Sequence, residues 1–105
     1  PTRWKRLPIG LSSPHPYPNN SKLRFEIHHP GAKNIRLHFS KFDLEPDYDT
    51  LTLRDASGRL VYAHSGNLAE GVSADAIGES LYIEFESDFV RTAYGFDIDA
   101  YEIAE

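Results

Sequence analysis

Four carboxylates fall within seven residues of the segment 42–49, which reads Phe-Asp-Leu-Glu-Pro-Asp-Tyr-Asp. They are Asp43, Glu45, Asp47 and Asp49. Two interpretations fit this crowding. The segment can be an acidic turn exposed to solvent, or it can be a site for a hard cation, because Ca²⁺ takes six to eight oxygen ligands and neutralises carboxylates that would otherwise repel one another.

The alternating spacing of these acids is that of an EF-hand calcium loop, but two diagnostic positions differ. Counted from Asp43, the sixth position is Tyr48 where an EF-hand has glycine. The twelfth position is Arg54 where an EF-hand has glutamate. The segment is therefore not an EF-hand loop.

Other groups that could do chemistry do not form a catalytic pattern. His28 and His29 are adjacent and would point to opposite faces of a strand, which disfavours a shared zinc ion. No strand-turn-helix motif of the G-x-S-x-G type is present. Glu45 and Asp49 could act as a glycosidase pair only in a deep cleft, which so small a domain rarely supplies. We expect no catalytic residues and no intrinsic enzyme activity.

The elements that must position the acidic segment are β-strands. Apolar residues alternate with polar ones in five runs, around residues 23–27, 35–39, 51–53, 81–85 and 96–100. A further short strand is expected at 60–64, and turn sequences with Gly, Pro, Asn or Asp separate the runs. The segment 67–77 comes nearest to a helical pattern but contains Gly71 and few large apolar residues. We predict an all-β fold with almost no helix, an antiparallel two-sheet β-sandwich or jelly roll.

Length and composition place these strands in one domain. The chain has 105 residues, a net charge of −5 and no cysteine, which excludes disulfides and thiolate metal sites. The acidic balance argues against nucleic acid, and no apolar run is long enough to span a membrane. We predict a soluble domain of a larger or matured protein, with a linker or terminal arm at 1–10 and the sandwich at 11–105. The prolines between positions 8 and 18 favour an edge segment or strap there.

The strap sequence Ser13-Pro14-His15-Pro16-Tyr17-Pro18-Asn19-Asn20 resembles the opening segment of a CUB domain. The resemblance continues in order along almost the whole chain. The matching pieces are Phe25-x-Ile27, Ile35 to Phe39, Phe42-Asp43-Leu44-Glu45, Tyr48-Asp49-x-Leu51, Ser65-Gly66, Ile83-x-Phe85-x-Ser87-Asp88 and Tyr94-Gly95-Phe96.

The resemblance implies a jelly roll that binds one Ca²⁺ at one end. By motif, the metal ligands would be Glu45, Asp49 and Asp88, with backbone carbonyls from residues 89–92 completing the shell. Tyr17 of the strap matches a tyrosine that hydrogen-bonds an acidic ligand in such sites. Asp43 and Asp47 are possible additional acidic residues of the site.

The absence of cysteine departs from animal secreted CUB domains, which usually carry two disulfides. Cysteine-free relatives occur as accessory domains of secreted prokaryotic subtilisin-like proteases and within large intracellular ubiquitin ligases. The phrases at 13–20, 29–33 and 93–99 are most similar to the protease-attached group. This similarity favours a secreted prokaryotic domain.

Two functions follow. The first is a non-catalytic calcium-binding accessory module that stabilises or positions a larger protein, most simply a secreted protease, and that captures a basic side chain of a protein ligand. Its partner would be a neighbouring domain of the same polypeptide or a protein ligand. The alternative is a metal-independent module that recognises protein or carbohydrate through exposed aromatic residues, for which the candidates are Trp4, Tyr48, Tyr62, Tyr82, Tyr94 and Tyr101.

Overall fold

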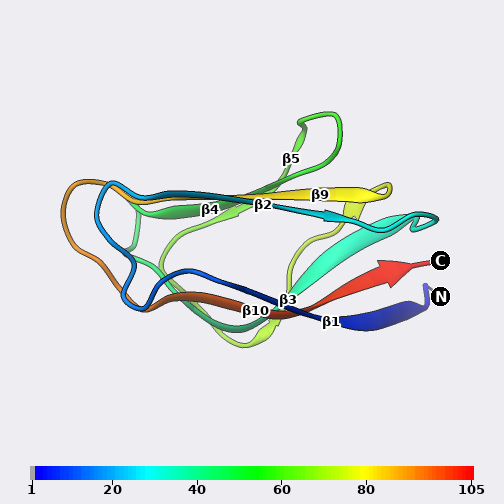
Figure 1. Ribbon diagram of the computed structural model, residues 1–105, viewed down its shortest axis with the longest axis horizontal. Helices are drawn as coiled ribbons and strands as arrows, with labels where there is room; N and C mark the ends of the chain where they lie inside the picture. The colour runs from blue at the N-terminus through cyan, green and yellow to red at the C-terminus, as the bar shows by residue number, and fades with distance from the viewer. Residues whose placement is uncertain (1) are drawn as a thin grey trace.

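Alternating apolar residues build two antiparallel sheets that pack face to face. The computed structural model describes residues 2–105 and contains ten strands and no helix in that range (Figure 1). The first sheet has the order β1 (Trp4–Ser12), β10 (Gly95–Ala104), β3 (Asn34–Asp43) and β6 (Asn67–Leu68). The short strands β7 (Gly71–Val72) and β8 (Ala76–Ile77) also pair with β3. The predicted all-β sandwich is confirmed.

The second sheet has the order β2 (Lys22–His28), β9 (Ser80–Glu86), β4 (Thr50–Arg54) and β5 (Leu60–His64). Its inward residues, such as Leu53, Ile83 and Phe85, pack against Leu37 and Phe96 of the first sheet in one apolar cluster. Each such side chain contributes about 1.5–3 kcal/mol when fully buried. Because no disulfide is present, this core supplies much of the stability of the domain.

Strand β1 occupies much of the segment 1–10, for which the sequence predicts a linker or terminal arm. Trp4 to Pro8 pair with β10 in regular register, and the register shifts only after Pro8. Leu7 and Ile9 pack against the core. Proline is tolerated here because β1 lies at the sheet edge, where one side of the strand needs no N–H donor.

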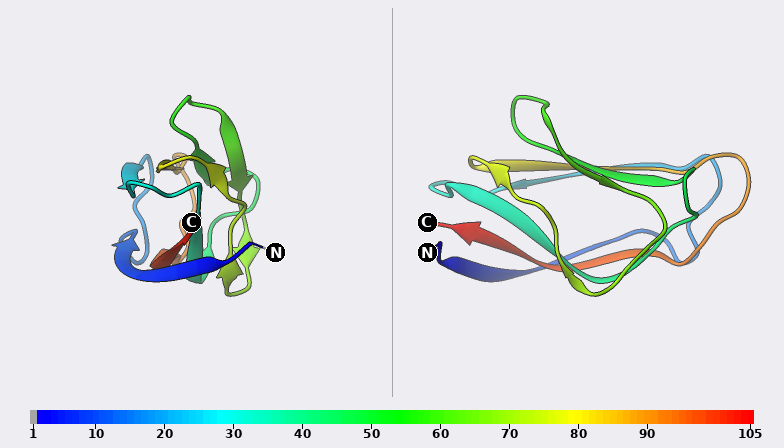
Figure 2. Two further views of the ribbon diagram at one scale, coloured as in Figure 1. Left: turned by 90° about the vertical axis from the view of Figure 1, so that its right-hand side faces the viewer. Right: turned by 180° about the vertical axis from the view of Figure 1, so that it is seen from behind.

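Three long connections gather at one end of the sandwich, and the termini lie at the other end (Figures 1 and 2). The loop end contains the connections 13–21, 44–49 and 87–94. Backbone hydrogen bonds join two of these connections, since the Asn20 amide donates to the Asp88 carbonyl at 2.7 Å. Within residues 2–105 there is no helix with the length and apolar character needed to cross a membrane.

Candidate metal centre

Three carboxylates from two distant connections meet at the loop end. Glu45 and Asp49 follow β3, and Asp88 follows β9. One oxygen of each lies within 4.8 Å of the others. Buried Leu44 anchors the first connection, and its amide donates to the Gly66 carbonyl at 2.9 Å. Local packing therefore holds the glutamate in place beside the two aspartates.

Tyr17 positions the cluster from the proline-rich strap. Its hydroxyl donates to Asp49 Oδ2 at 2.6 Å and accepts from the Glu45 amide at 3.0 Å. Its ring packs edge-on against Phe85, with 4.8 Å between centroids. Burial, followed by the hydrogen bond to Asp49, raises the pKa of Tyr17, so the hydroxyl remains a donor at neutral pH.

Gly95 lets the strap approach β10 closely. Its φ is 105°, and a Cβ atom there would lie 1.9 Å from Ser13 Oγ. That hydroxyl accepts from the Phe96 amide at 3.0 Å and donates to the Pro14 carbonyl. The strap is thereby fixed at its first residues, which places Tyr17 over the acidic cluster.

Asp49 is fully buried and connects the two loops. Its Oδ1 accepts from the Asp88 amide at 2.9 Å, while Oδ2 accepts from Tyr17. Hydrogen bonds to the charged form stabilise an ionised carboxylate in a buried position. Both carboxylate oxygens of Asp49 therefore have hydrogen-bond partners within the chain.

Glu45 lacks such compensation. Its Oε1 is buried and has no hydrogen-bond partner. Burial, and then the nearby charges of Asp88 and Asp49, raise the pKa of Glu45. An orphaned carboxylate oxygen next to two further carboxylates is a set of hard, negative donors that fits Ca²⁺. A bound cation would offset the repulsion among the three carboxylates and would give Oε1 of Glu45 a partner.

The structure does not bring Asp43 and Asp47 into this cluster. Asp43 lies on β3 opposite Gly95. Asp47 is exposed, has a φ of 72°, and its amide donates to Ser65 Oγ at 3.0 Å. The three carboxylates that lie close together thus do not include Asp43 or Asp47.

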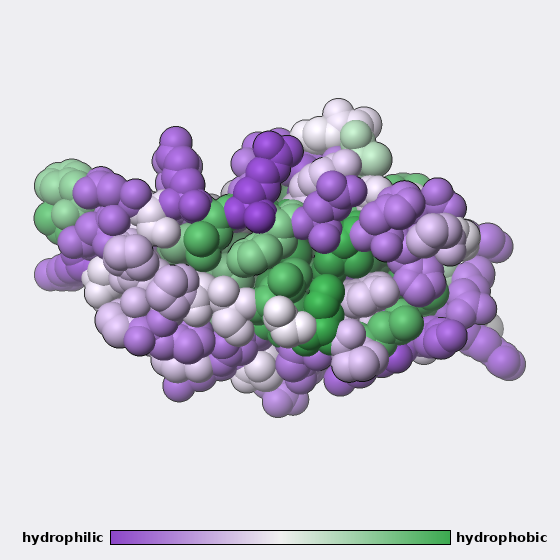
Figure 3. Space-filling view, in the orientation of Figure 1, coloured by the Kyte–Doolittle hydropathy of each residue, from purple (hydrophilic) through white to green (hydrophobic). Residues whose placement is uncertain are grey.

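Exposed apolar side chains surround the mouth of the cluster, which the sequence reasoning did not single out. A hollow of about 410 Å³ is lined by Glu45, Tyr48, Asp88, Phe89, Val90 and Arg91. Phe89 and Tyr48 are 73% and 69% exposed. Figure 3 shows a hydrophobic patch at the same end as the β9–β10 connection. The sequence does contain a signal for this patch: Phe89 and Val90 are adjacent apolar residues that follow Ser87-Asp88 and belong to no alternating run.

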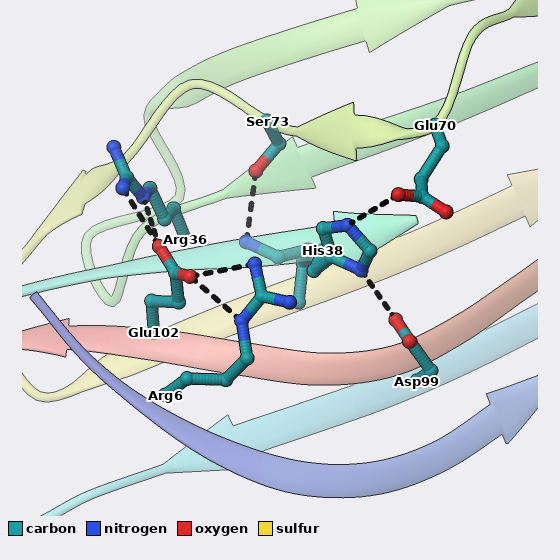
Figure 4. Close-up of polar contacts among 8 residues, drawn as sticks. Arg6, Arg36, His38, Glu70, Ser73, Asp99 and Glu102 are labelled. Carbon is teal, nitrogen blue, oxygen red and sulfur yellow. Dashed lines mark hydrogen bonds and ion pairs between the residues drawn. The ribbon is translucent and has the colours of Figure 1, made fainter. Parts of the chain in front are cut away.

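A second acidic group lies on the outer face of the first sheet, where arginines neutralise it (Figure 4). Glu102 is buried, and its two oxygens bind Arg6 and Arg36 at 2.7–2.8 Å. The Arg36 guanidinium also stacks 3.8 Å from the centre of the Trp4 ring. Arg6 and Trp4 therefore hold β1 against β10 and β3.

The histidines and the aromatic candidates are dispersed over the fold. Within residues 2–105, the acidic cluster is the one metal-competent group of three, and no histidine belongs to it. His38 instead pairs with Asp99 at 2.6 Å (Figure 4), and His29 contacts Tyr101. Of the six aromatic candidates, all of them described, Tyr48 alone is exposed. They do not form a common platform.

Comparison with known proteins assigns the family. Residues 10–100 match the family model described as the CUB domain. The chain belongs to the CUB family. CUB domains are non-catalytic protein-recognition modules, which confirms the expectation that the domain is not itself an enzyme.

The curated relatives are much longer than this CUB domain. It is 31% identical over 87 residues to human zinc finger ZZ-type and EF-hand domain-containing protein 1, covering 80% of this chain and 3% of that protein. It is 28% identical over 104 residues to human E3 ubiquitin-protein ligase HERC2, covering 96% and 2%. Human neuropilin-2 is 31% identical over 98 residues, covering 86% and 10%. The domain therefore spans a tenth or less of these multidomain proteins.

Solved structures support the CUB fold. The CUB1-EGF-CUB2 region of human MASP-1/3 superposes with a TM-score of 0.75 at 24% identity, covering 97% of this chain and 41% of that one. The full extracellular region of zebrafish Gpr126 gives 0.78 at 24% identity, covering 93% and 14%. The MASP-1 CUB2 domain bound to Ca²⁺ gives 0.64 at 22% identity, covering 88% of each chain.

Proposed function

We propose that this CUB domain binds one Ca²⁺ through Glu45, Asp49 and Asp88, and that the ion orders the loop end as a recognition surface for a protein partner. The observation that carries the proposal is the buried, partnerless Oε1 of Glu45 beside two further carboxylates. Tyr17 would hold Asp49 and the Glu45 backbone in place for the ion. The calcium-bound CUB2 domain of MASP-1 has a similar fold, which supports the choice of metal.

Charge and shape indicate the kind of partner. Three carboxylates around one Ca²⁺ leave a net negative charge, which favours a lysine or arginine side chain of the ligand. The exposed Tyr48, Phe89 and Val90 around the hollow would contact the apolar part of that residue and its neighbours. The ion would thus contribute both stability and specificity.

We further propose that the domain is a secreted prokaryotic accessory module that stabilises or positions a larger polypeptide, most simply a subtilisin-like protease. The absence of cysteine and the phrases at 13–20, 29–33 and 93–99 support this setting. The small share of each curated relative that the domain spans supports a partner domain in the same polypeptide.

Thermal unfolding in EDTA, in Ca²⁺ and in Mg²⁺ tests the metal. A ligand that binds only the folded state at a hundredfold excess over Kd adds about 2.7 kcal/mol, so Ca²⁺ should raise Tm by at least several degrees. Asp88→Ala should abolish the rise. Asp43→Ala and Asp47→Ala are matched controls, because both remove a nearby carboxylate outside the cluster, and both should retain it. No calcium-specific rise in the unaltered chain would refute the proposal.

A metal-independent recognition module is the second candidate, because Tyr48 and Phe89 are exposed at the loop end. Under this function, Phe89→Ser would weaken partner binding while EDTA would leave it unchanged. Under the calcium function, EDTA and Asp88→Ala would both weaken it. Binding of the same partner, measured with and without EDTA, separates the two.

A further inference from the structure

Strand β2 forms an open edge of the second sheet. Within residues 2–105 it pairs with β9 alone, from Lys22 opposite Glu86 to His28 opposite Ser80. The register has no shift along its seven residues. In Figure 1 the strand lies at the front of its sheet, with no neighbour on the viewer's side. An unpaired, regular edge presents backbone donors and acceptors that can pair with another strand.

The hydrogen bonds that flank β2 identify which of its backbone groups are free. The Ser87 amide donates to the Ser21 carbonyl, and the His29 amide donates to the Glu79 carbonyl. Hydrogen-bonded positions alternate along an antiparallel strand, so the odd-numbered residues of β2 face β9. The amides and carbonyls of Arg24 and Glu26 therefore face away from the domain.

The sequence of β2 is complementary to itself when reversed. Antiparallel pairing of two copies about Phe25 would place Arg24 opposite Glu26 of the second copy, and Glu26 opposite Arg24. It would place Leu23 opposite Ile27 on the inner face. Both charged residues are exposed, and opposite charges at facing positions stabilise a strand pair.

Charged residues, prolines, irregular register and short length usually prevent edge strands from pairing, and the edge strands β1 and β5 show such protection. Strand β1 carries Lys5, Arg6 and Pro8 and has a register shift. Strand β5 is shorter, and its pairing with β4 also shifts in register. In β2 the charges would attract rather than repel across the two-fold axis, so the usual protection fails for a second copy of this chain.

Apolar groups beside this edge would gain from such pairing. Figure 3 shows a hydrophobic area on the face where β1 and β2 lie in front in Figure 1. Five apolar residues of these strands are only partly buried: Leu7, Ile9, Leu11, Leu23 and Phe25. A two-fold axis perpendicular to the second sheet would bring this area of each copy toward the same area of the other, which removes apolar surface from water.

We propose that two copies of this chain associate through antiparallel pairing of β2 with β2, centred on Phe25, to form one continuous eight-stranded sheet. The pairing direction places the loop ends of the two copies at opposite ends of the dimer. The dimer therefore presents two recognition surfaces that face apart. This association does not depend on the metal.

Sedimentation equilibrium of the chain over a wide concentration range, in EDTA, tests the proposal. Glu26→Arg is the first variant, because position 26 faces Tyr82 within the domain but would face Arg24 in the partner copy. It should raise the dimer dissociation constant by about tenfold or more, since two attractive pairs become repulsive. Arg59→Glu reverses an exposed charge in the β4–β5 turn and is the matched control, which should leave the constant unchanged.

Two rescues make the test specific to this register. The double variant Arg24→Glu/Glu26→Arg restores both pairs and should dimerise like the unaltered chain. An equimolar mixture of Glu26→Arg with Arg24→Glu should form heterodimers, although each variant alone remains monomeric.

Hydrogen exchange of the unaltered chain tests the same pairing and does not depend on whether a variant folds. The amide protons of Arg24 and Glu26 should exchange more slowly as protein concentration rises, while those of Leu23 and Phe25 should not change. A chain that stays monomeric at every concentration overturns the proposal. A dimer that Glu26→Arg does not weaken, or amides of Arg24 and Glu26 that stay unprotected in the dimer, overturns it as well.

Discussion

Two groups of buried carboxylates in this CUB domain have opposite electrostatic surroundings. On the outer face of the first sheet, Glu102 lies between Arg6 and Arg36 (Figure 4). At the loop end, Glu45 lies beside Asp49 and Asp88, and its buried Oε1 has no partner. Burial acts to raise the pKa of Glu102, but hydrogen bonds and charges from the arginines hold that pKa below its usual value. Burial and neighbouring carboxylates raise the pKa of Glu45.

The difference shows how to separate a structural acidic residue from one that awaits a cation. Glu102 receives its positive charges from the same chain, so its burial is complete without a ligand. At the loop end, Asp49 accepts hydrogen bonds from the Tyr17 hydroxyl and the Asp88 amide. Glu45 has too little positive charge nearby, because Arg91 does not cancel the rise in its pKa. The presence of buried carboxylates alone does not distinguish the two groups. They differ in whether side chains of the same chain supply the positive charge that balances the carboxylates.

The largest expected effect is that of Asp49→Ala in saturating Ca²⁺. We expect a loss of about 3 kcal/mol, because the variant removes the calcium-dependent stabilisation and the carboxylate that joins the two loops. In EDTA the loss should be smaller, since repulsion with Glu45 disappears together with the hydrogen bonds. Urea unfolding in both buffers measures the difference. Equal losses in the two buffers would contradict a metal at this position.

Glu102→Gln should destabilise the domain by about 2 kcal/mol in EDTA and in Ca²⁺ alike. The substitution leaves Arg6 and Arg36 next to each other without their shared counter-ion. The value stays below that for a fully buried ion pair, because the Arg6 side chain is half exposed. Urea unfolding in the two buffers again measures the loss. A change in the calcium response would show that the two groups of carboxylates are coupled.

Tyr17→Phe should cost about 1.5 kcal/mol in EDTA, because Asp49 Oδ2 and the Glu45 amide lose their shared partner. The packing against Phe85 is retained. We expect calcium affinity to fall about 10–100-fold, as when other residues that orient metal ligands are removed. Isothermal titration calorimetry measures the affinity, and an unchanged Kd would show that the hydroxyl does not orient the site.

The smallest effect is a pH dependence of opposite sign in the two groups. The lowered pKa of Glu102 means that its stabilisation is present above the usual value of 4.5 and is lost as pH falls through the lowered value. The raised pKa of Glu45 means that, in EDTA, protonation as pH falls toward 4.5 stabilises the domain. Unfolding free energies between pH 7 and 3, compared with Glu102→Gln and Glu45→Gln, should resolve both slopes. If the contributions of Glu102 and Glu45 to the unfolding free energy changed with pH in the same direction, the opposite electrostatic surroundings of the two residues would be contradicted.

Sequence reasoning was most successful where the information is local. Alternation at residues such as Leu51, Leu53 and Ile83 predicts strands, because side chains on a pleated strand alternate between the two faces. The prolines predict an extended edge segment from residue 8, and β1 is an edge strand that already begins at Trp4, because an edge strand tolerates Pro8. Sequence reasoning left 67–77 unassigned, where the strands β6, β7 and β8 have two residues each and β3 supplies their pairing.

The acidic residues show the same difference between local sequence information and long-range contacts. The sequence by itself determined a cysteine-free β-sandwich with a CUB-like order of motifs and a crowded acidic segment, because periodicity and motif order are properties of neighbouring residues. The resemblance to CUB domains names Asp88, 39 residues beyond Asp49, as a ligand, but only the tertiary structure shows that it lies beside Glu45 while the nearer Asp43 and Asp47 are not in the group. The physical reason is that contacts between distant segments depend on how the sheets pair and where the loops pack. The number of residues between two carboxylates does not fix the distance between them in space.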